Sequence, residues 1–303
     1  MYNLKMINEI SSDMSEFKVD DFSDISFWDK IFGSLHTSYT ANLESSFKPF
    51  DIESDRLELY KARLINEGFI QMPQLLWDDW FINLKEAIDL FERLSIPLPF
   101  IFVYCEPWLL VSKLNVVIKK LFGDSYYLLP DFWVWHVDPN KEAAGWMPHR
   151  DKGPNSLFQN GAPKSLTIWI PITDATIENG CMYVLPANRD PSYISGGFDK
   201  EKLDMQNIVA LPASAGSPLI WNQGVLHWGS RSLLRNIPPR MSVAFEVQIA
   251  NIDPFNQPLI KPLDIPNFED RLKLICKQVL QYSHMYPLQK DIELFAKKHS
   301  GLT

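Results

Sequence analysis

Short apolar segments alternate with turn residues between residues 124 and 250. Each segment is rich in aromatic and β-branched residues and is bounded by Gly, Pro, Asn or Asp. This composition and length are typical of β-strands. Many short strands at this spacing indicate a sandwich or a barrel, of which the jelly roll is one form. The segments are YYLLPDFWVWHVDP, SLTIWIPIT, CMYVLP, GSPLIWNQGVLHWGS and RMSVAFEVQI.

Helical patterns precede this region. EGFIQMPQLL predicts a short strand closed by Pro73, and WDDWFINLKEAIDLFERL then predicts an amphipathic helix. A second helix begins near Pro107 and ends before Gly123, with Lys119 and Lys120 in its last turn. The buried face predicted for the first helix consists of Trp77, Phe81, Leu84, Ile88 and Phe91.

The chain after the predicted strands has two parts. Four prolines between residues 254 and 266 predict an extended segment, and the last stretch predicts two helices separated at Pro287. We therefore expect a mainly β protein with flanking helices. Its parts are an N-terminal helical or irregular extension at 1–60, a central domain at 61–250 with its own N-terminal helices, and a C-terminal helical extension at 251–303 that packs on the core.

Composition and charge narrow the class of partner. The 303 residues are 46% hydrophobic and 22% charged, with a net charge of −8 and a pI of about 5.3. This acidic balance disfavours nucleic acid or an anionic membrane surface as the main partner. The N-terminal residues do not resemble a secretory signal, and the longest apolar stretch is interrupted by Glu106 and Pro107. Three widely spaced cysteines indicate neither a disulfide framework nor a cysteine-based zinc site. We expect a cytoplasmic protein without a membrane partner.

The segment GWMPHRDKG places His149 and Asp151 two residues apart. On a strand, side chains at i and i+2 point to the same face. The pair can therefore supply two thirds of a 2-His-1-carboxylate metal site, which leaves coordination positions open on an octahedral iron. A second pair, His136 and Asp138, is a rival, but Asp138 precedes Pro139, where its strand should end.

A third ligand and an anion site are suggested further along the chain. His227 follows an apolar strand in GVLHWGS. Arg240 begins the apolar segment RMSVAFEVQI, and a buried arginine is unfavourable unless an anion meets it. Ser242 is on the same face at i+2, so the two side chains can hold a carboxylate. The alternative for Arg240 is an internal salt bridge with Glu246 or Asp174.

Together these motifs resemble Fe(II)/2-oxoglutarate-dependent oxygenases, and more closely the phytanoyl-CoA dioxygenase family. The resemblance covers about residues 60 to 248. It rests on EGFIQMPQLL with its following helix, GWMPHRD, SLTIWIPITDATIENGCMYVLPANRD and GVLHWGSRSLLRNIPPRMSVAFEV. The interval from His227 to Arg240 is slightly longer than is common in that family, with LLRNIPP as the extra segment, which leaves Arg235 as a competitor for the anion role.

The resemblance implies a double-stranded β-helix of jelly-roll, cupin-like type. It also implies that His149, Asp151 and His227 bind Fe(II) and act in catalysis, and that Arg240 and Ser242 hold the far carboxylate of the cosubstrate 2-oxoglutarate. Thr167 and Trp169 are expected to line the cosubstrate pocket. Oxygen is the third reactant, and hydroxylation of a small molecule, with release of succinate and CO2, is the expected reaction.

Three further expectations concern the substrate and the reaction. Halogenases similar to this family carry a small residue in the position of Asp151, so a hydroxylase is favoured over a halogenase. Trp146, Arg150 and Trp135 are candidates for substrate contact. The alternatives are an oxygenase that acts on a protein side chain and a non-catalytic jelly-roll module that binds a ligand or metal. A module without catalysis has no need of the Arg240–Ser242 pair.

Overall fold

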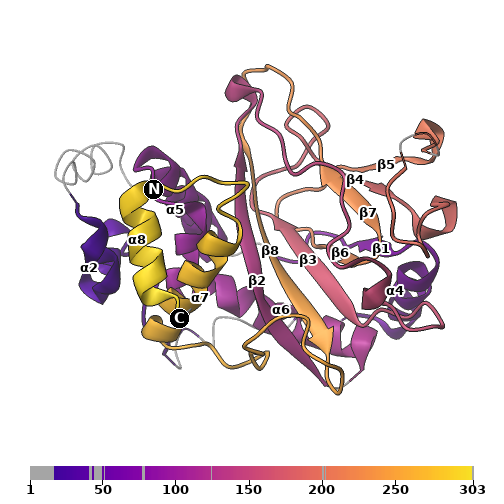
Figure 1. Ribbon diagram of the computed structural model, residues 1–303, viewed down its shortest axis with the longest axis horizontal. Coiled ribbons are helices and arrows are strands. Elements are labelled where there is room, and N and C mark those ends of the chain that lie inside the picture. Colours follow the sequence, from indigo (N-terminus) through magenta and orange to yellow (C-terminus); the bar gives the residue numbers. More distant parts are fainter. Residues whose placement is uncertain are drawn as a thin grey trace. The chain divides into compact units, whose positions relative to one another are not determined.

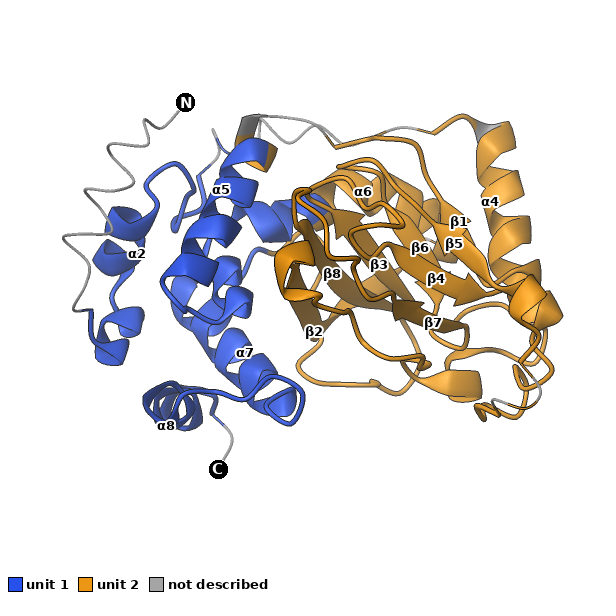
Figure 2. Cartoon of the chain, turned by 90° about the horizontal axis from the view of Figure 1, so that it is seen from above, with its two compact units in different colours: residues 1–47, 82–110, 265–303 blue, residues 48–81, 111–264 orange. Residues whose placement is uncertain are grey.

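The computed structural model describes residues 17–40, 43, 50, 52–76, 79–123, 125–199, 201 and 203–301. The chain forms two compact units, each built from segments that are distant in the sequence (Figure 2). One unit comprises residues 1–47, 82–110 and 265–303, and the other comprises residues 48–81 and 111–264. The predicted central domain at 61–250 supplies most of the second unit, whereas both predicted extensions contribute to the first.

The second unit contains two antiparallel sheets (Figure 1). The larger sheet has the strand order β1-β6-β3-β8-β2, and the smaller has the order β5-β4-β7. From β5 to β8 consecutive strands alternate between the two sheets, as in a jelly roll, which confirms the predicted fold class. The strands are β1 Phe69–Gln71, β2 Tyr126–Val137, β3 Ser165–Pro171, β4 Met182–Leu185, β5 Val209–Leu211, β6 Leu219–Asn222, β7 Leu226–Gly229 and β8 Arg240–Ile249.

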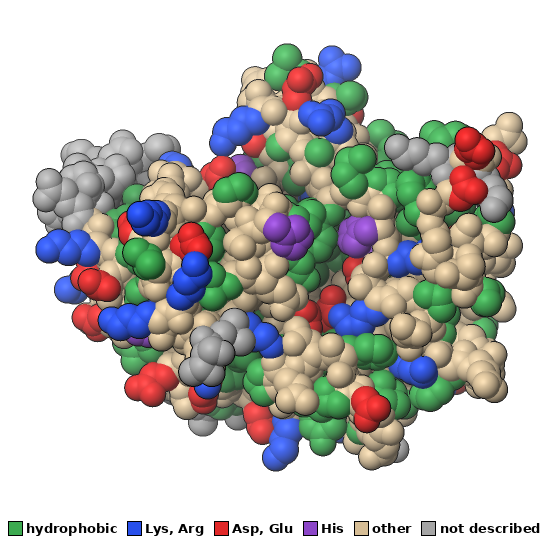
Figure 3. Space-filling view, in the orientation of Figure 1, with side chains coloured by type: hydrophobic (Ala, Val, Ile, Leu, Met, Phe, Trp, Pro, Cys, Tyr) green, Lys and Arg blue, Asp and Glu red, His purple; other side chains and the backbone are tan. Residues whose placement is uncertain are grey.

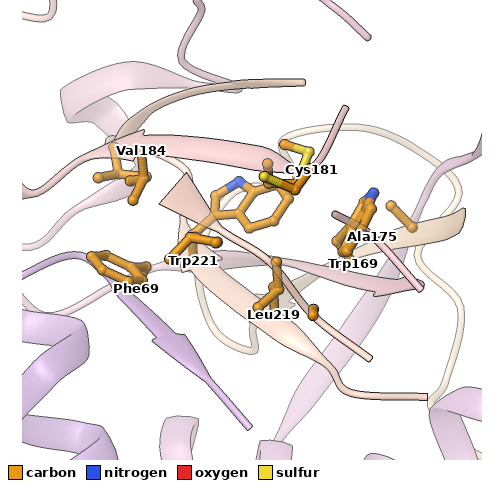
Figure 4. Packing of buried hydrophobic residues seen from close by; sticks show 12 residues of the cluster. Phe69, Trp169, Ala175, Cys181, Val184, Leu219 and Trp221 are labelled. Carbon is orange, nitrogen blue, oxygen red and sulfur yellow. The ribbon is translucent and has the colours of Figure 1, made fainter. Parts of the chain in front are cut away.

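Strand register decides which side chains face the space between the sheets. Trp169 on β3 lies opposite Ala244 on β8 and Leu219 on β6. Directly opposed residues in an antiparallel sheet share a face, so these three belong to one inner face. Their side chains join a buried cluster with Trp221 and Cys181 and with residues of both sheets (Figure 4). Burial of this apolar surface is the main stabilising contribution to the jelly roll.

The same register places the predicted cosubstrate residues on the inner face. Trp135 on β2 and Pro171 on β3 both lie opposite Ser242, and Val137 lies opposite Arg240. Arg240 and Ser242 are two apart on β8 and therefore point to the same side. The alternation of the strand thus brings a charged and a hydroxyl side chain into an otherwise apolar interior.

The segment that carries His149 and Asp151 is not a regular strand. Single bridges join Ala144 to Arg231 and His149 to His227, and the residues between them are irregular. Pro148 has no amide hydrogen to donate to a ladder, which accounts for the interruption. The predicted strand geometry for the His-x-Asp pair was therefore wrong in detail, although one residue of the pair does pair with β7.

Helices of the first unit surround an aromatic centre. Trp28 stacks on Phe100, with ring centroids 5.8 Å apart, and it also contacts Phe22 and Phe91. The indole of Trp28 donates to the Phe22 carbonyl at 3.0 Å, so its polar group is satisfied in the interior. Among the described residues, the α-helices that lie wholly in this unit are α2 Ile25–Ile31, α7 Phe268–Gln281 and α8 Lys290–His299.

Two predicted helices, α5 Asp79–Arg93 and α6 Glu106–Phe122, are present, and each contributes residues to both units. Trp77, which we placed on the buried face of the first of these, lies outside the described residues. Helix α4, Ser54–Asn66, was not predicted as a distinct element. Its buried face of Leu57, Tyr60 and Leu64 shows that helical spacing was present there. Among the described residues, no helix is both long and apolar enough to cross a membrane.

Candidate metal and cosubstrate site

Three side chains converge at the edge where the His-x-Asp segment meets β7. The backbones of His149 and His227 exchange two hydrogen bonds, each of 3.0 Å. This pairing brings Nε2 of both imidazoles to 3.4 Å from the Oδ1 atom of Asp151. The potential ligand atoms of the three residues lie within 4.8 Å of one another. One metal ion could therefore contact all three.

Backbone carbonyls orient both imidazoles. Nδ1 of His149 lies 2.7 Å from the Met147 carbonyl, and Nδ1 of His227 lies 3.2 Å from the Val225 carbonyl. Because a carbonyl only accepts, Nδ1 must be the protonated nitrogen in each neutral ring. Each Nε2 then presents its lone pair toward Asp151, as a metal ligand does. Nε2 of His149 is buried without a hydrogen-bond partner, which fits a position that a metal fills.

The charges of the site also suit a divalent cation. Burial lowers the pKa of His227 to about 4, so this imidazole is neutral at pH 7. Burial by itself raises the pKa of Asp151, but the neighbouring histidines and the hydrogen bonds that it accepts outweigh burial and hold that pKa below its usual range. A neutral imidazole and an ionised carboxylate are the forms that bind metal. Burial would lower the pKa of His149, but contact with Asp151 outweighs burial and raises it, so a metal must compete with a proton there.

The second oxygen of Asp151 is engaged by the protein. Oδ2 accepts from Oγ1 of Thr167 at 2.6 Å and from Nε1 of Trp221 at 3.0 Å. The amide of Gln223 donates to the Thr167 hydroxyl at 3.0 Å. We expected Thr167 to line the cosubstrate pocket, and that role stays a prediction. Sequence reasoning did not identify Trp221 or Gln223, whose alternate spacing in LIWNQG was the available signal.

Arg240 and Ser242 form a buried polar pair on β8. Arg240 is 1% exposed, and its guanidinium lies 5.6 Å above the ring of Trp169 and 3.5 Å from the sulfur of Met182. The Ser242 hydroxyl is buried without a hydrogen-bond partner. A buried cation beside an unsatisfied hydroxyl suits a carboxylate ligand, because the carboxylate would supply acceptors to both.

The two carboxylates considered as partners of Arg240 each make another contact. Glu246 pairs with Nζ of Lys152 at 2.5 Å, and Asp174 accepts from the backbone of Ala215 at 2.8 Å. The competitor Arg235 is 59% exposed and lies 3.9 Å from Glu178. Of the two arginines, Arg240 has the buried position and the hydroxyl neighbour that a cosubstrate site requires.

Two glycines let the ligand-bearing segments approach closely. A Cβ atom on Gly229 would lie 2.9 Å from the Cα of Gly145 and 3.4 Å from Nη1 of Arg240. Gly229 is two residues from His227, and its amide donates to the Trp146 carbonyl at 3.2 Å. The absence of a side chain therefore preserves both the contact between the segments and the space beside the guanidinium.

We expect Gly229→Ala to destabilise the protein by about 1–3 kcal/mol, as overpacking in an interior typically does. It should also lower metal affinity, because the added methyl group pushes apart the segments that carry His149 and His227. Urea unfolding and iron content would measure the two effects. Gly197→Ala is the matched control, since a Cβ there meets nothing within 4 Å. Equal behaviour of the two variants would contradict this account of Gly229.

The rival pair, His136 and Asp138, is not part of the candidate metal cluster. Asp138 caps a short 3-10 helix, Pro139–Lys141, and accepts from the amide of Asn140 at 2.9 Å. Among the described residues, the cluster with metal-binding geometry is the one formed by His149, Asp151 and His227, and it includes neither His136 nor Asp138.

Of the tryptophans proposed for substrate contact, Trp146 lies beside the candidate metal ligand His149 and Trp135 lies beside Trp146. The ring centroid of Trp146 is 5.6 Å from that of His149, and Trp135 meets Trp146 edge to face at 5.3 Å. The side chain of His149 is 30% exposed, so this side of the cluster reaches solvent. Figure 3 shows histidine side chains around a hollow in the face of the molecule that it draws.

Arg150 points away from the cluster. It is 5% exposed and pairs with Asp190 at 2.7 Å, and it donates to the carbonyls of Gly224 and Gly197 at 2.7 and 3.1 Å. Successive residues of an extended segment face opposite sides, which accounts for this direction. The predicted substrate contact of Arg150 gains no support from this placement.

A jelly roll that carries a 2-His-1-carboxylate cluster beside a buried Arg–Ser pair has the features of non-haem iron oxygenases. The phytanoyl-CoA dioxygenase (PhyH) family model matches residues 54–232. The chain belongs to this family, which confirms the resemblance inferred from its motifs.

Individual relatives are more distant. The dioxygenase lolE1 of Epichloe uncinata is 26% identical over 114 residues, which are 37% of this chain and 42% of that protein. The chain therefore aligns with less than half of that relative. The carbocyclase SnoK from nogalamycin biosynthesis, described as a non-heme alpha ketoglutarate dependent enzyme, is 16% identical with a TM-score of 0.52, and the match covers 67% of this chain and 88% of SnoK. AviO1 from Streptomyces viridochromogenes Tue57 is 18% identical with a TM-score of 0.50, covering 69% of this chain and all of AviO1. These structures establish the fold.

Proposed function

We propose that this protein is a non-haem Fe(II)/2-oxoglutarate-dependent dioxygenase that hydroxylates an unactivated C–H bond of a small molecule. The observation that carries the proposal is the placement of the His149–Asp151–His227 cluster in the same interior as Arg240 and Ser242. A metal-binding module without redox chemistry would not need the second feature.

In this proposal one set of residues binds the metal and another binds the cosubstrate. His149, Asp151 and His227 would hold Fe(II) through two neutral imidazoles and one carboxylate. Arg240 and Ser242 would bind the far carboxylate of 2-oxoglutarate, while Trp169 supports the guanidinium by contact with its face. When bound, iron and 2-oxoglutarate together reduce O2 and supply the oxidant for C–H hydroxylation, with succinate and CO2 as products.

The chain's own groups set the conditions for this chemistry. The buried inner face, with Trp135 and Trp169, limits access of water to the cosubstrate side. Trp146 and Trp135 present aromatic surface next to His149, where a substrate carbon would approach. The presence of Asp151 as a carboxylate ligand favours hydroxylation over halogenation, since it occupies a position that chloride would need.

The test is an anaerobic titration of the purified protein with Fe(II) and 2-oxoglutarate. We expect a weak visible charge-transfer band, because a keto acid that chelates iron produces one. A screen of small molecules for succinate release in air would then identify the substrate class. Failure of the protein to bind either component would contradict the proposal and favour a non-catalytic ligand-binding module. Succinate release that depends on a folded protein substrate would instead indicate side-chain modification.

A further inference from the structure

The two oxygens of the Asp151 carboxylate face different surroundings. Oδ1 lies 3.4 Å from Nε2 of both histidines, whereas Oδ2 accepts hydrogen bonds from Thr167 and Trp221. A carboxylate can bind a metal through one oxygen or through both. The hydrogen bonds to Oδ2 therefore bear on how many coordination positions Asp151 takes.

Adjacent strands position the two donors. Thr167 on β3 is the register partner of Trp221 on β6, so both side chains project from the same inner face. Trp221 is 4% exposed and lies in the buried cluster of Figure 4, which restricts its indole to one orientation. Its ring centroid is 4.5 Å from that of His227, so the same side chain also borders a second ligand.

Gln223 fixes the direction of the hydrogen bond from Thr167. A hydroxyl has one proton. Because the Gln223 amide donates to Oγ1 of Thr167, that hydroxyl is directed to donate its own proton to Asp151. The backbone carbonyl of Gln223 also accepts from the backbone amides of Lys152 and Gly153, each at 3.0 Å. Gln223 thus holds both the Thr167 side chain and the backbone that follows Asp151.

We infer that Trp221, Thr167 and Gln223 are positioning residues that reserve Oδ2 of Asp151 and leave Oδ1 as the single oxygen offered to the metal. This inference rests on the proposed function. If Oδ2 also bound the metal, it would take a position that 2-oxoglutarate or O2 needs. The three residues therefore keep the carboxylate from closing the site that the two imidazoles leave open.

The test uses the full-length protein loaded with Co(II) in place of iron, because the visible absorption of Co(II) reports the metal's ligands and their geometry without turnover. Thr167→Val removes the hydroxyl at nearly constant volume, and Trp221→Phe removes the indole donor. In each variant we expect metal affinity to fall about 10- to 100-fold, the usual effect of losing a group that orients a ligand. We also expect an altered Co(II) spectrum, because Oδ2 becomes free to replace a water ligand of the metal.

Two variants serve as controls. Thr167→Ser keeps the hydroxyl and should retain wild-type affinity and spectrum. Trp228→Phe makes the same tryptophan-to-phenylalanine change next to His227, at a residue that stacks on Tyr183 instead of contacting Asp151, and should also leave both unchanged. If Trp221→Phe does not fold, the Thr167 variants decide the question.

The outcomes separate this inference from the proposed function. A wild-type Co(II) spectrum in Thr167→Val and Trp221→Phe would overturn the positioning role, even if metal affinity fell. Loss of affinity with an unchanged spectrum indicates general loosening of the fold. A third outcome is that the variants give the expected Co(II) spectra but the wild-type protein never consumes 2-oxoglutarate. That outcome would contradict the proposed function and leave the positioning role intact.

Discussion

Asp151→Ala is expected to weaken iron binding by at least about 100-fold, more than the loss of an orienting group causes, and to abolish turnover. The reason is that Asp151 supplies the negative charge of the cluster, while His227 and His149 supply neutral nitrogens. Its removal also leaves the Thr167 hydroxyl and the Trp221 indole without their acceptor. Colorimetric iron content and succinate formation would measure the two effects.

The control for this prediction is Asp138→Ala, at the carboxylate of the rival His-x-Asp pair. Asp138 accepts from the amide of Asn140 at the start of a short helix. Its loss should lower the free energy of unfolding by about 0.5–2 kcal/mol, as for other helix caps, and leave iron content unchanged. If Asp151→Ala is active and contains iron while Asp138→Ala contains none, the metal is bound by the pair His136 and Asp138, and the assignment to His149 and Asp151 is wrong.

Arg240→Ala is expected to weaken binding of 2-oxoglutarate by about 2–5 kcal/mol, as when one partner of a buried charge pair is truncated. Arg240 is 1% exposed, so its removal would leave the cosubstrate carboxylate that we propose it binds in a buried position without a cationic partner. Iron binding should persist, because Arg240 is not among the three converging ligands. The Kd of 2-oxoglutarate can be read from the charge-transfer band in an anaerobic titration.

Arg235→Ala is the matched control for Arg240. Arg235 is exposed and lies 3.9 Å from Glu178, and such surface ion pairs contribute little to stability. We expect the Arg235→Ala variant to bind 2-oxoglutarate with the affinity of the wild type. Arg240→Lys should recover part of the loss, because the charge remains while the planar fork does not. A cosubstrate affinity that responds to Arg235 and not to Arg240 would transfer the anion role to Arg235.

Local patterns in the sequence were sufficient to predict most of the strands and most of the helices. The five apolar segments after residue 124 contain six of the eight strands of the structure, β2, β3, β4, β6, β7 and β8, and EGFIQMPQLL contains β1. Strand β5 was missed, because VAL is too short to produce a periodic signal. The motifs His-x-Asp, distal His and Arg-x-Ser were visible for the same reason, since each depends on neighbouring positions.

Contacts between distant segments could not be read from local pattern. Trp221 lies beside Thr167 because β6 pairs with β3, and both donate to Asp151 from a distant segment; the sequence LIWNQG contains no sign of that register. The partner of Arg150 was likewise hidden, since Asp190 is 40 positions further along the chain. The discontinuous composition of the two units has the same origin, because it reflects tertiary contacts that join residues 1–47 and 82–110 with 265–303.

The buried pair of Arg150 and Asp190 has a consequence for protein engineering. Asp190 lies at the start of the connection between β4 and β5, and Arg150 stands between two metal ligands in the sequence. A chimera that exchanges this connection for a loop of another length should therefore keep Asp190, because Arg150, between His149 and Asp151, would otherwise lose its buried ion pair. Loop swaps intended to broaden substrate range should begin after this residue, and libraries that randomise it would confuse altered selectivity with an incorrectly assembled metal centre.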